Sequence, residues 1–334
     1  MVEFKENSTG YDVNYTAPPT GYPGPIISMP GVVVLATASV AVSLINILVI
    51  TAVVVNRNLH SASNYFYASL TIAGVFIGLI TIPINTWLFA TFPVSQTYWT
   101  CTGMTFMQMV GLMSFVLNML VTSFDKYYQL VHPFSYQKVM TSRKAVITSS
   151  VTWGIALLYS SAPLLGWNNV ALNRQTSGCL FRYVATFEYI CLTHYGIVVP
   201  CTVAIVYFNS KIICVAKQEA RKIRAQKVSV TRRNDFRTGR KSTVALLIML
   251  GMLLVGWLPF LVVVQVSAMC QHCVTDSSIS GLALLALAST AIGPMTYGLR
   301  QEDYRKTMEQ ILIKLFCGWY CRTPPIGQRT PSNV

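Results

Sequence analysis

Charged side chains are scarce in this sequence, and acidic ones are the scarcest. Asp, Glu, Lys and Arg make up 11% of the 334 residues, with 11 acids against 25 bases and only 4 histidines. A soluble domain carries about 25% charged residues. The long apolar stretches hold no pair of carboxylates, no cluster of histidines and no nucleophile beside a base, which argues against an enzyme. We therefore expect neither a cofactor nor a bound metal.

Hydrophobic residues make up 53% of the chain, and the mean hydropathy is +0.50. Each long apolar segment can cross roughly 30 Å of hydrocarbon at about 1.5 Å per residue. The segments lie near residues 31–55, 63–89, 98–131, 145–167, 187–216, 241–268 and 278–299. The sequence thus predicts an all-α membrane protein, a seven-transmembrane helix bundle over residues 31–300. We expect a tail over 1–30, and an amphipathic helix with a second tail over 301–334.

The basic residues predict the orientation of the bundle. Seven crossings place the two ends of the chain on opposite sides, and all 25 Lys and Arg residues except Lys5, Arg174 and Arg182 fall on the side of the C-terminus. Positive residues favour the cytoplasm, so we expect an extracellular N-terminus and a cytoplasmic C-terminus. This distribution explains the net charge of +14 by topology and contact with anionic membrane lipids. It argues against nucleic acid as a partner, because no soluble domain presents the bases.

The basic loop over 217–240 has two readings. The first is a solvated loop with cytoplasmic helix extensions, and the second is a docking surface for an acidic cytoplasmic partner.

Both tails carry candidate modification sites. Residues 1–22 are polar, which predicts no signal peptide and makes the first apolar segment the insertion signal. Two glycosylation sequons lie there, at Asn7 and Asn14. Residues 301–316 form an amphipathic pattern that predicts a helix on the membrane surface. Cys317 and Cys321 follow it, either as palmitoylation sites or as free reduced thiols.

The nine cysteines separate by their side of the membrane. Cys101 and Cys179 both fall on the extracellular side, where the oxidising environment makes them natural disulfide partners. Cys270 and Cys273 share one short extracellular loop, which predicts a local disulfide, with zinc binding as the rival interpretation. We expect the cysteines inside the fifth segment to be buried hydrophobic residues; these are Cys191, Cys201 and Cys214.

A set of motifs occurs in order along the segments. Asp125-Lys126-Tyr127 ends the third, Trp257-Leu258-Pro259 lies in the sixth and Pro294-Met295-Thr296-Tyr297 ends the seventh. With these motifs, residues 31–317 resemble the rhodopsin-like G-protein-coupled receptors. Other residues that match the family pattern are Asn46, Leu70, Ala73, Cys101, Cys179, Trp153 and Pro200.

The resemblance implies a plasma-membrane receptor that binds a small molecule and activates a heterotrimeric G protein. The coupling residues that it implies are Asp125, Lys126, Tyr127 and Tyr297. Pro200, Pro259 and Pro294 each remove a helix hydrogen bond, and such kinks give helices two packings that a ligand can bias.

Some segments resemble adenosine receptors in particular. These are Leu164-Leu165-Gly166-Trp167-Asn168-Asn169, Cys179-Leu180-Phe181 and the Cys270–Cys273 loop. The run from Trp257 to Leu261, together with that loop, is also similar to the related fatty-acid-ethanolamide receptor. The resemblance makes Phe181 a lid that stacks on a planar ligand. Adenosine recognition needs polar groups near Val264, Ala286 and Leu287, and their absence argues against adenosine itself.

Several residues depart from the family pattern. Gly74, Phe115 and Gly293 replace the polar residues of the family's sodium site, so we expect no sodium-linked pocket. Lys126 replaces the Arg of the coupling triplet and lacks its planar fork of donors. The region of Gly239, Arg240 and Lys241 offers no Glu to pair with Lys126. Phe208 takes the place of the fifth segment's tyrosine, with Tyr207 beside it. We expect weak or atypical coupling.

The predicted ligand site is nearly free of charge. The ligand-binding candidates are Gln108, Phe181, His194, Trp257 and Gln265, with Met104, Met107 and Met269 nearby. Gln108 stands where amine receptors place an Asp, and Leu287 where opsins place the retinal Lys. The site therefore predicts an uncharged or lipophilic ligand. For Gln108 and Gln265 the alternative is hydrogen bonding between helices.

Two other classes of membrane protein remain as alternatives. A non-signalling or decoy receptor is the first, because of the departures from the family pattern. A transporter is less favoured, since the sequence shows no internal repeat and no intramembrane acid.

Overall fold

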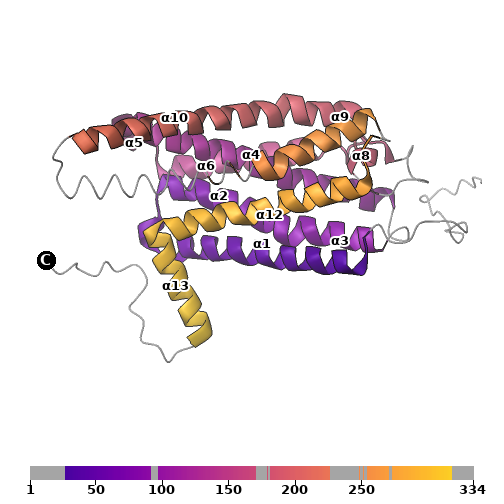
Figure 1. The fold of residues 1–334 in the computed structure, drawn as a ribbon, viewed down its shortest axis with the longest axis horizontal. Coiled ribbons are helices and arrows are strands. Elements are labelled where there is room, and N and C mark those ends of the chain that lie inside the picture. The colour runs from indigo at the N-terminus through magenta and orange to yellow at the C-terminus, as the bar shows by residue number, and fades with distance from the viewer. Residues whose placement is uncertain are drawn as a thin grey trace, which may run out of the picture.

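The fold is a bundle of long helices lying side by side (Figure 1). The computed structural model describes residues 27–91, 97–170, 179, 181–225, 248, 251, 254–270 and 273–317. Within those ranges the only β-type contact is an isolated bridge between Asn168 and Ala185.

The first three predicted segments form helices close to the expected bounds. Helix α1 spans Met29–Val55. Helix α2, Ala62–Phe76, continues through the π-helical η2, Ile77–Thr81, into α3, Ile82–Ala90. Helix α4 spans Tyr98–Val131 and packs against α2, α6 and α10. It thus forms the centre of the bundle.

The later helices complete the bundle. Helix α6 spans Ser142–Ser160. Helix α9, Phe187–Cys191, runs through the π-helical η3, Leu192–Val198, into α10, Val199–Ala225. A helix spans Leu254–Met269, and α12 spans Asp276–Arg300. Four of the described helices are long and apolar enough to cross a membrane: α1, α2–α3, α4 and α9–α10.

The prediction for the fourth segment was wrong at its end. Helix α6 stops at Ser160, whereas hydropathy extended the segment to residue 167. Residues 161–166 form turns instead, and the backbone reverses at Gly166, whose φ of 103° favours glycine. The sequence analysis also missed two short helices, α5 over Pro133–Val139 and α8 over Phe181–Val184.

Each π-helical segment lies just before a proline. The N–H of Ile82 donates to the carbonyl of Ile77, one residue before Pro83. The N–H of Val199 likewise donates to the carbonyl of His194, one residue before Pro200. Proline has no N–H to donate, so the regular hydrogen bonding of the α-helix is interrupted there. The wider π-helical turn accommodates this interruption.

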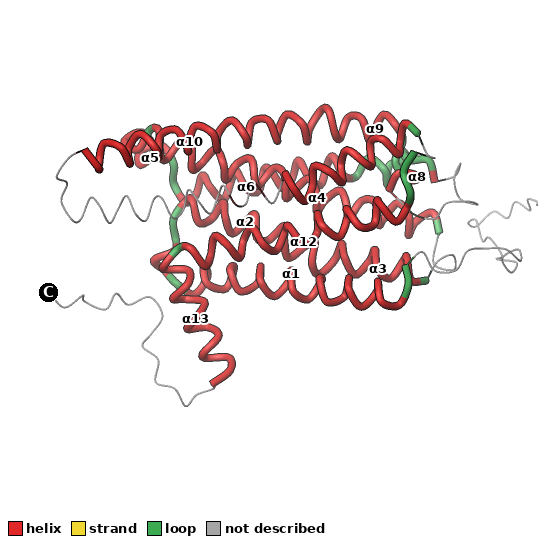
Figure 2. Tube along the Cα trace, in the orientation of Figure 1, coloured by secondary structure: helices red, strands yellow, loops and turns green. Residues whose placement is uncertain are grey.

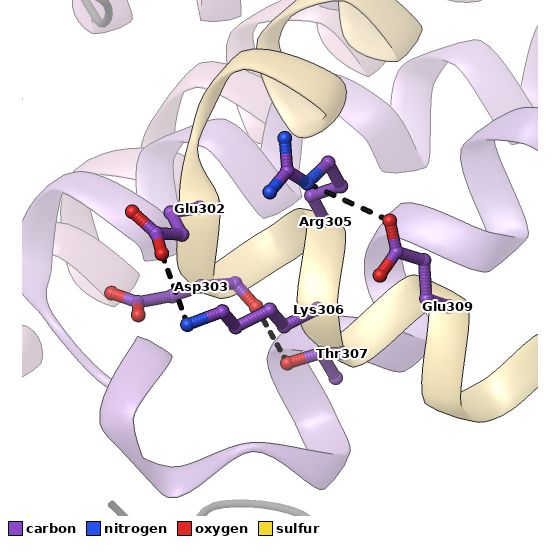
Figure 3. A network of polar contacts seen from close by, with 6 residues as sticks. All are labelled: Glu302, Asp303, Arg305, Lys306, Thr307 and Glu309. Atoms are coloured by element: carbon purple, nitrogen blue, oxygen red, sulfur yellow. Dashed lines mark hydrogen bonds and ion pairs between the residues drawn. The ribbon is translucent and has the colours of Figure 1, made fainter. Parts of the chain in front are cut away.

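The bundle has two distinct ends. We call the end with the Cys101–Cys179 and Cys270–Cys273 bonds the disulfide end, and the opposite one the α13 end. Helix α13, Glu302–Cys317, leaves the bundle there and crosses the direction of its helices (Figure 2). Two ion pairs run along α13: Lys306 Nζ lies 3.0 Å from Glu302 Oε1, and Arg305 Nε 3.6 Å from Glu309 Oε1 (Figure 3).

One face of α13 is fixed to the bundle. The Asn56 Nδ2 after α1 donates to Thr307 Oγ1 over 2.7 Å, and Thr307 in turn donates to the carbonyl of Asp303. The buried Tyr304 ring meets Tyr67 of α2 edge-on, with centroids 5.6 Å apart. The apolar Leu312, Ile313 and Leu315 remain exposed. The predicted amphipathic helix is therefore present and docked.

Candidate functional site

Disulfides tie the loops at the disulfide end to the helices. Cys101 at the start of α4 is bonded to Cys179, and Cys270 to Cys273, with Cα–Cα distances of 4.9 and 5.4 Å. Both pairs are those expected from the sequence. Asn169 N donates to the carbonyl of Val184 over 2.8 Å, which holds the segment after α6 against α8. The first bond therefore fixes where α8 begins.

Phe181, the first residue of α8, lies two residues after the disulfide-bonded Cys179. Its half-buried ring packs against the main core cluster. Two of the methionines that the sequence placed near the site differ in their surroundings. Met104 is buried in a separate cluster with Cys101, Cys179 and Val184 beneath the disulfide, and Met269 is 62% exposed.

His194 and Gln265 join two helices near this end. His194 lies in η3, and its Nδ1 donates to Gln265 Oε1, on Leu254–Met269, over 2.7 Å. Gln265 Nε2 points to Cys191 Sγ at 3.6 Å. Both side chains of the pair are buried. The hydrogen bond between helices that the sequence left open for Gln265 is therefore present.

Gln108 differs from Gln265. It lies on α4 and is half-buried, and its Oε1 is buried without a hydrogen-bond partner among the described residues. An acceptor in this state is available to a bound molecule.

Trp257 lies deeper in the bundle, where its indole is 7% exposed. Phe115 of α4 stacks on it, with ring centroids 6.2 Å apart and planes 27° apart. Phe260, one turn further along the same helix, meets it edge-on. Its Nε1 has no hydrogen-bond partner among the described residues.

The region around Gly74 is filled by a neighbouring side chain. A Cβ on Gly74 would lie 2.6 Å from the Cγ of Asn46 on α1. Asn46 is fully buried and its Nδ2 donates to the carbonyl of Val42 over 2.8 Å. Gly293 is also buried. None of the three replaced positions, Gly74, Phe115 and Gly293, supplies an oxygen from its side chain, and a sodium site depends on oxygen ligands.

Asp125 at the α13 end is held by hydroxyl groups. It is fully buried, accepts from Ser63 Oγ at the start of α2, and accepts from Tyr136 of α5 over 2.8 Å. Its neighbour Lys126 instead reaches Gln129 Oε1 at 3.5 Å. The two adjacent charges thus face different surroundings.

Tyr127 belongs to an aromatic cluster beside Asp125. Its ring lies 5.2 Å from that of Phe208 on α10, and Phe208 meets Phe124 at 5.5 Å. Tyr207 is 51% exposed, with Lys211 Nζ 5.6 Å from its ring. Phe208 is half-buried and contacts two aromatic rings of α4.

Some predicted residues lie outside the described part of the chain. These are Asn7, Asn14, Cys321, the side chains of Cys317 and Tyr297, and the loop from 226 to 247. Of the three cysteines expected to be buried, Cys191 and Cys201 are half-buried and Cys214 is exposed. For Cys214 the prediction was wrong, because it lies on the outer face of α10.

Sequence reasoning missed the polar partners that fix α4. Ser69 of α2 donates to Asn118 Oδ1 over 2.7 Å and accepts from Trp153 Nε1 of α6 over 3.1 Å. Ser63 and Tyr136, which hold Asp125, were missed as well. Ser and Tyr are common along these segments, so their presence alone did not mark these partners. The one available signal was that each is a polar residue within an apolar stretch.

Comparison with known proteins gives consistent matches. The model of the family described as 7 transmembrane receptor (rhodopsin family) matches residues 45–297. The adenosine receptor A2b of Gallus gallus is 25% identical over 301 residues, covering 81% of this chain and 85% of the relative. The adenosine receptor A2a of Homo sapiens is 25% identical over 291 residues, covering 80% and 68%. The D(1B) dopamine receptor of Xenopus laevis is 24% identical over 333 residues, covering 86% and 70%.

Proposed function

Because the chain belongs to the rhodopsin family of seven-transmembrane receptors, we propose that it carries the signal of an uncharged or lipophilic small molecule to heterotrimeric G proteins. The fold is that family's seven-helix bundle, and the chain is a multi-pass protein of the plasma membrane and not an enzyme. The class of ligand and the sites are the proposal.

The His194–Gln265 pair is the observation that carries the proposed ligand class. Gln265 is an uncharged amide, and its oxygen accepts a hydrogen bond from His194 across two helices. The sequence from 254 to 275 contains no charged residue, and α4 contains none before Asp125. A charged ligand would find no counter-ion on these stretches, whereas an uncharged one is not penalised there. Gln108, whose buried oxygen has no partner among the described residues, is the proposed hydrogen-bonding group for the ligand.

The ligands named for the relatives do not transfer directly. An amine such as dopamine calls for a carboxylate, and Gln108 offers only an amide. Adenosine calls for polar groups near residues that are Val264, Ala286 and Leu287 here. We therefore propose a ligand of neither kind, held under Phe181 and above Trp257.

We place G-protein contact at the α13 end. Asp125, Lys126 and Tyr127 lie there, beside α5, whose Phe134 is 87% exposed. The arrangement of Lys and Arg along the chain supports a cytoplasmic α13 end and an extracellular disulfide end. Tyr297 joins the proposed coupling residues by its position in the sequence. The basic surface also supports contact with anionic membrane lipids rather than with nucleic acid.

A non-signalling receptor is the second candidate function. Lys126 in place of Arg favours it, since lysine lacks the two-pronged donor geometry that coupling residues use. Gly74 and Gly293 favour it as well, because they remove polar groups that link the ligand site to the α13 end in the family pattern.

Cell membranes containing the chain can decide between these functions. Guanine-nucleotide exchange on added heterotrimeric G proteins should rise with a member of an uncharged-ligand library, and Lys126→Arg should increase the response. Specific ligand binding without exchange in either protein would favour the non-signalling receptor. Uptake of the ligand into sealed vesicles without exchange would favour a transporter.

A further inference from the structure

Among the described residues, aromatic rings contact the Trp257 ring and no polar group bonds it. Its Nε1 has no hydrogen-bond partner among the described residues, so no polar contact found there fixes its orientation. Phe115 and Phe260 are its two aromatic neighbours in the described part of the chain. Phe260 lies on the same helix and moves with it. Phe115, on α4, is the neighbour from a different helix.

The backbone beneath Trp257 has little room to move. A Cβ on Gly256 would lie 2.6 Å from the Cβ of Ser289 on α12 and 3.2 Å from the carbonyl of Leu285. The two helices are therefore in close contact one residue before the tryptophan. A change at Trp257 is then more easily made by rotating the side chain than by shifting the helix.

Phe115 stands where the resemblance to the family implies a serine. Its side chain is 5% exposed and belongs to the main core cluster with Trp257. A serine hydroxyl cannot cover an indole face, whereas a phenyl ring can. Phenylalanine at this position thus replaces a polar group with a ring that contacts Trp257, which lies between the two ends of the bundle.

We propose that Phe115 is the positioning residue that holds the Trp257 ring in the orientation seen here. Stacked aromatic pairs add enough stabilisation to change a two-state population about two- to twelvefold. Loss of the phenyl ring should therefore let a second orientation of Trp257 become populated. The consequence for signalling, a change in basal output, rests on the proposed function.

Fluorine NMR of the purified receptor labelled with 5-fluorotryptophan tests the proposal. The Trp257 resonance is assigned from its loss in Trp257→Phe. We expect Phe115→Leu to shift or split this resonance, and Phe115→Tyr, which keeps the ring, to leave it near the wild-type position. Phe124→Leu removes a phenyl ring further along α4, away from Trp257, and should leave it unchanged. A single wild-type resonance in Phe115→Leu would overturn the proposal, as would an equal shift in Phe124→Leu.

Two further measurements separate the possible failures. If Phe115→Leu does not fold, Phe115→Met provides a flexible apolar chain of similar size without a ring, and the same shift is expected. Basal nucleotide exchange on G proteins is measured in parallel and should change, by up to about twelvefold, in the leucine variant. Absence of exchange in every variant counts against the proposed coupling, while the position of the Trp257 resonance still decides the role of Phe115.

Discussion

The side chain of Asn46 fills the space that any side chain at residue 74 would need. A Cβ on Gly74 would lie 2.6 Å from Asn46 Cγ and 2.7 Å from its Nδ2, so the two residues are complementary across α1 and α2. Asn46 is also tied to the carbonyl of Val42, which limits how far it can withdraw. The glycine is therefore matched to its neighbour in shape.

This contact predicts that Gly74→Ala destabilises the protein. Forcing one methyl group into this packed site should cost about 1 to 3 kcal/mol. Thermal unfolding of the purified receptor in detergent measures the effect. Asn46→Ala should recover most of the loss in the double variant, because it vacates the space. Strictly additive effects of the two changes would show that the contact does not limit residue 74.

The His194–Gln265 hydrogen bond predicts unequal effects of single and double substitutions. Gln265→Leu leaves the buried His194 Nδ1 without its acceptor and should cost about 1 to 3 kcal/mol. The double variant with His194→Phe should cost less than the sum of the single changes, since no polar group is left unpaired. Thermal unfolding of the four proteins gives the coupling energy.

Tyr159→Phe is the matched control for that pair. It removes a 2.7 Å contact between Tyr159 OH and Thr193 Oγ1, next to His194 in η3. Thr193 keeps its own bond to the carbonyl of Tyr189, so Tyr159→Phe should lower the stability less than Gln265→Leu does. A loss as large as that of Gln265→Leu would mean that any polar change in this region has the same effect.

The two disulfides should contribute very differently to stability. Cys101 and Cys179 are 78 residues apart and Cys270 and Cys273 only 3. Closing the longer loop restricts the unfolded chain more, by roughly 4 kcal/mol against about 2 kcal/mol. Cys101→Ser with Cys179→Ser should therefore lower surface expression far more than the paired change at 270 and 273. Equal losses, measured by flow cytometry, would contradict this order.

Ligand binding and basal exchange should be insensitive to sodium. Gly74, Phe115 and Gly293 offer no side-chain oxygen to coordinate the cation. Replacing sodium chloride by N-methylglucamine chloride at constant ionic strength should leave both quantities unchanged. A selective effect of sodium, absent with potassium, would point to a cation site built from other oxygens.

Sequence patterns predicted the long helices well and the side-chain contacts between them poorly. The uncharged run before Asp125 was sufficient to place α4, because hydrocarbon excludes charge over its whole thickness. Hydropathy failed at the end of α6, since residues 161–167 are apolar enough to span but turn at Gly166. Backbone geometry decided that boundary.

The environment of Asp125 shows why the sites were harder to predict. Its two partners, Ser63 and Tyr136, come from positions 62 residues before it and 11 residues after it. No local pattern links them. Met104 illustrates the same point, because its place in the sequence did not show that it packs with Cys101, Cys179 and Val184.

The π-helical turns in η2 and η3 have a consequence for numbering. Each hydrogen bond closes over five residues instead of four, so the helix on the disulfide side of the turn is rotated by roughly 100° relative to an uninterrupted helix. A relative without the extra residue aligns across it only with a one-residue gap. Counting backwards from Pro83 or Pro200 therefore finds equivalent residues only up to the turn, and beyond it the count lands on a neighbouring face of the helix.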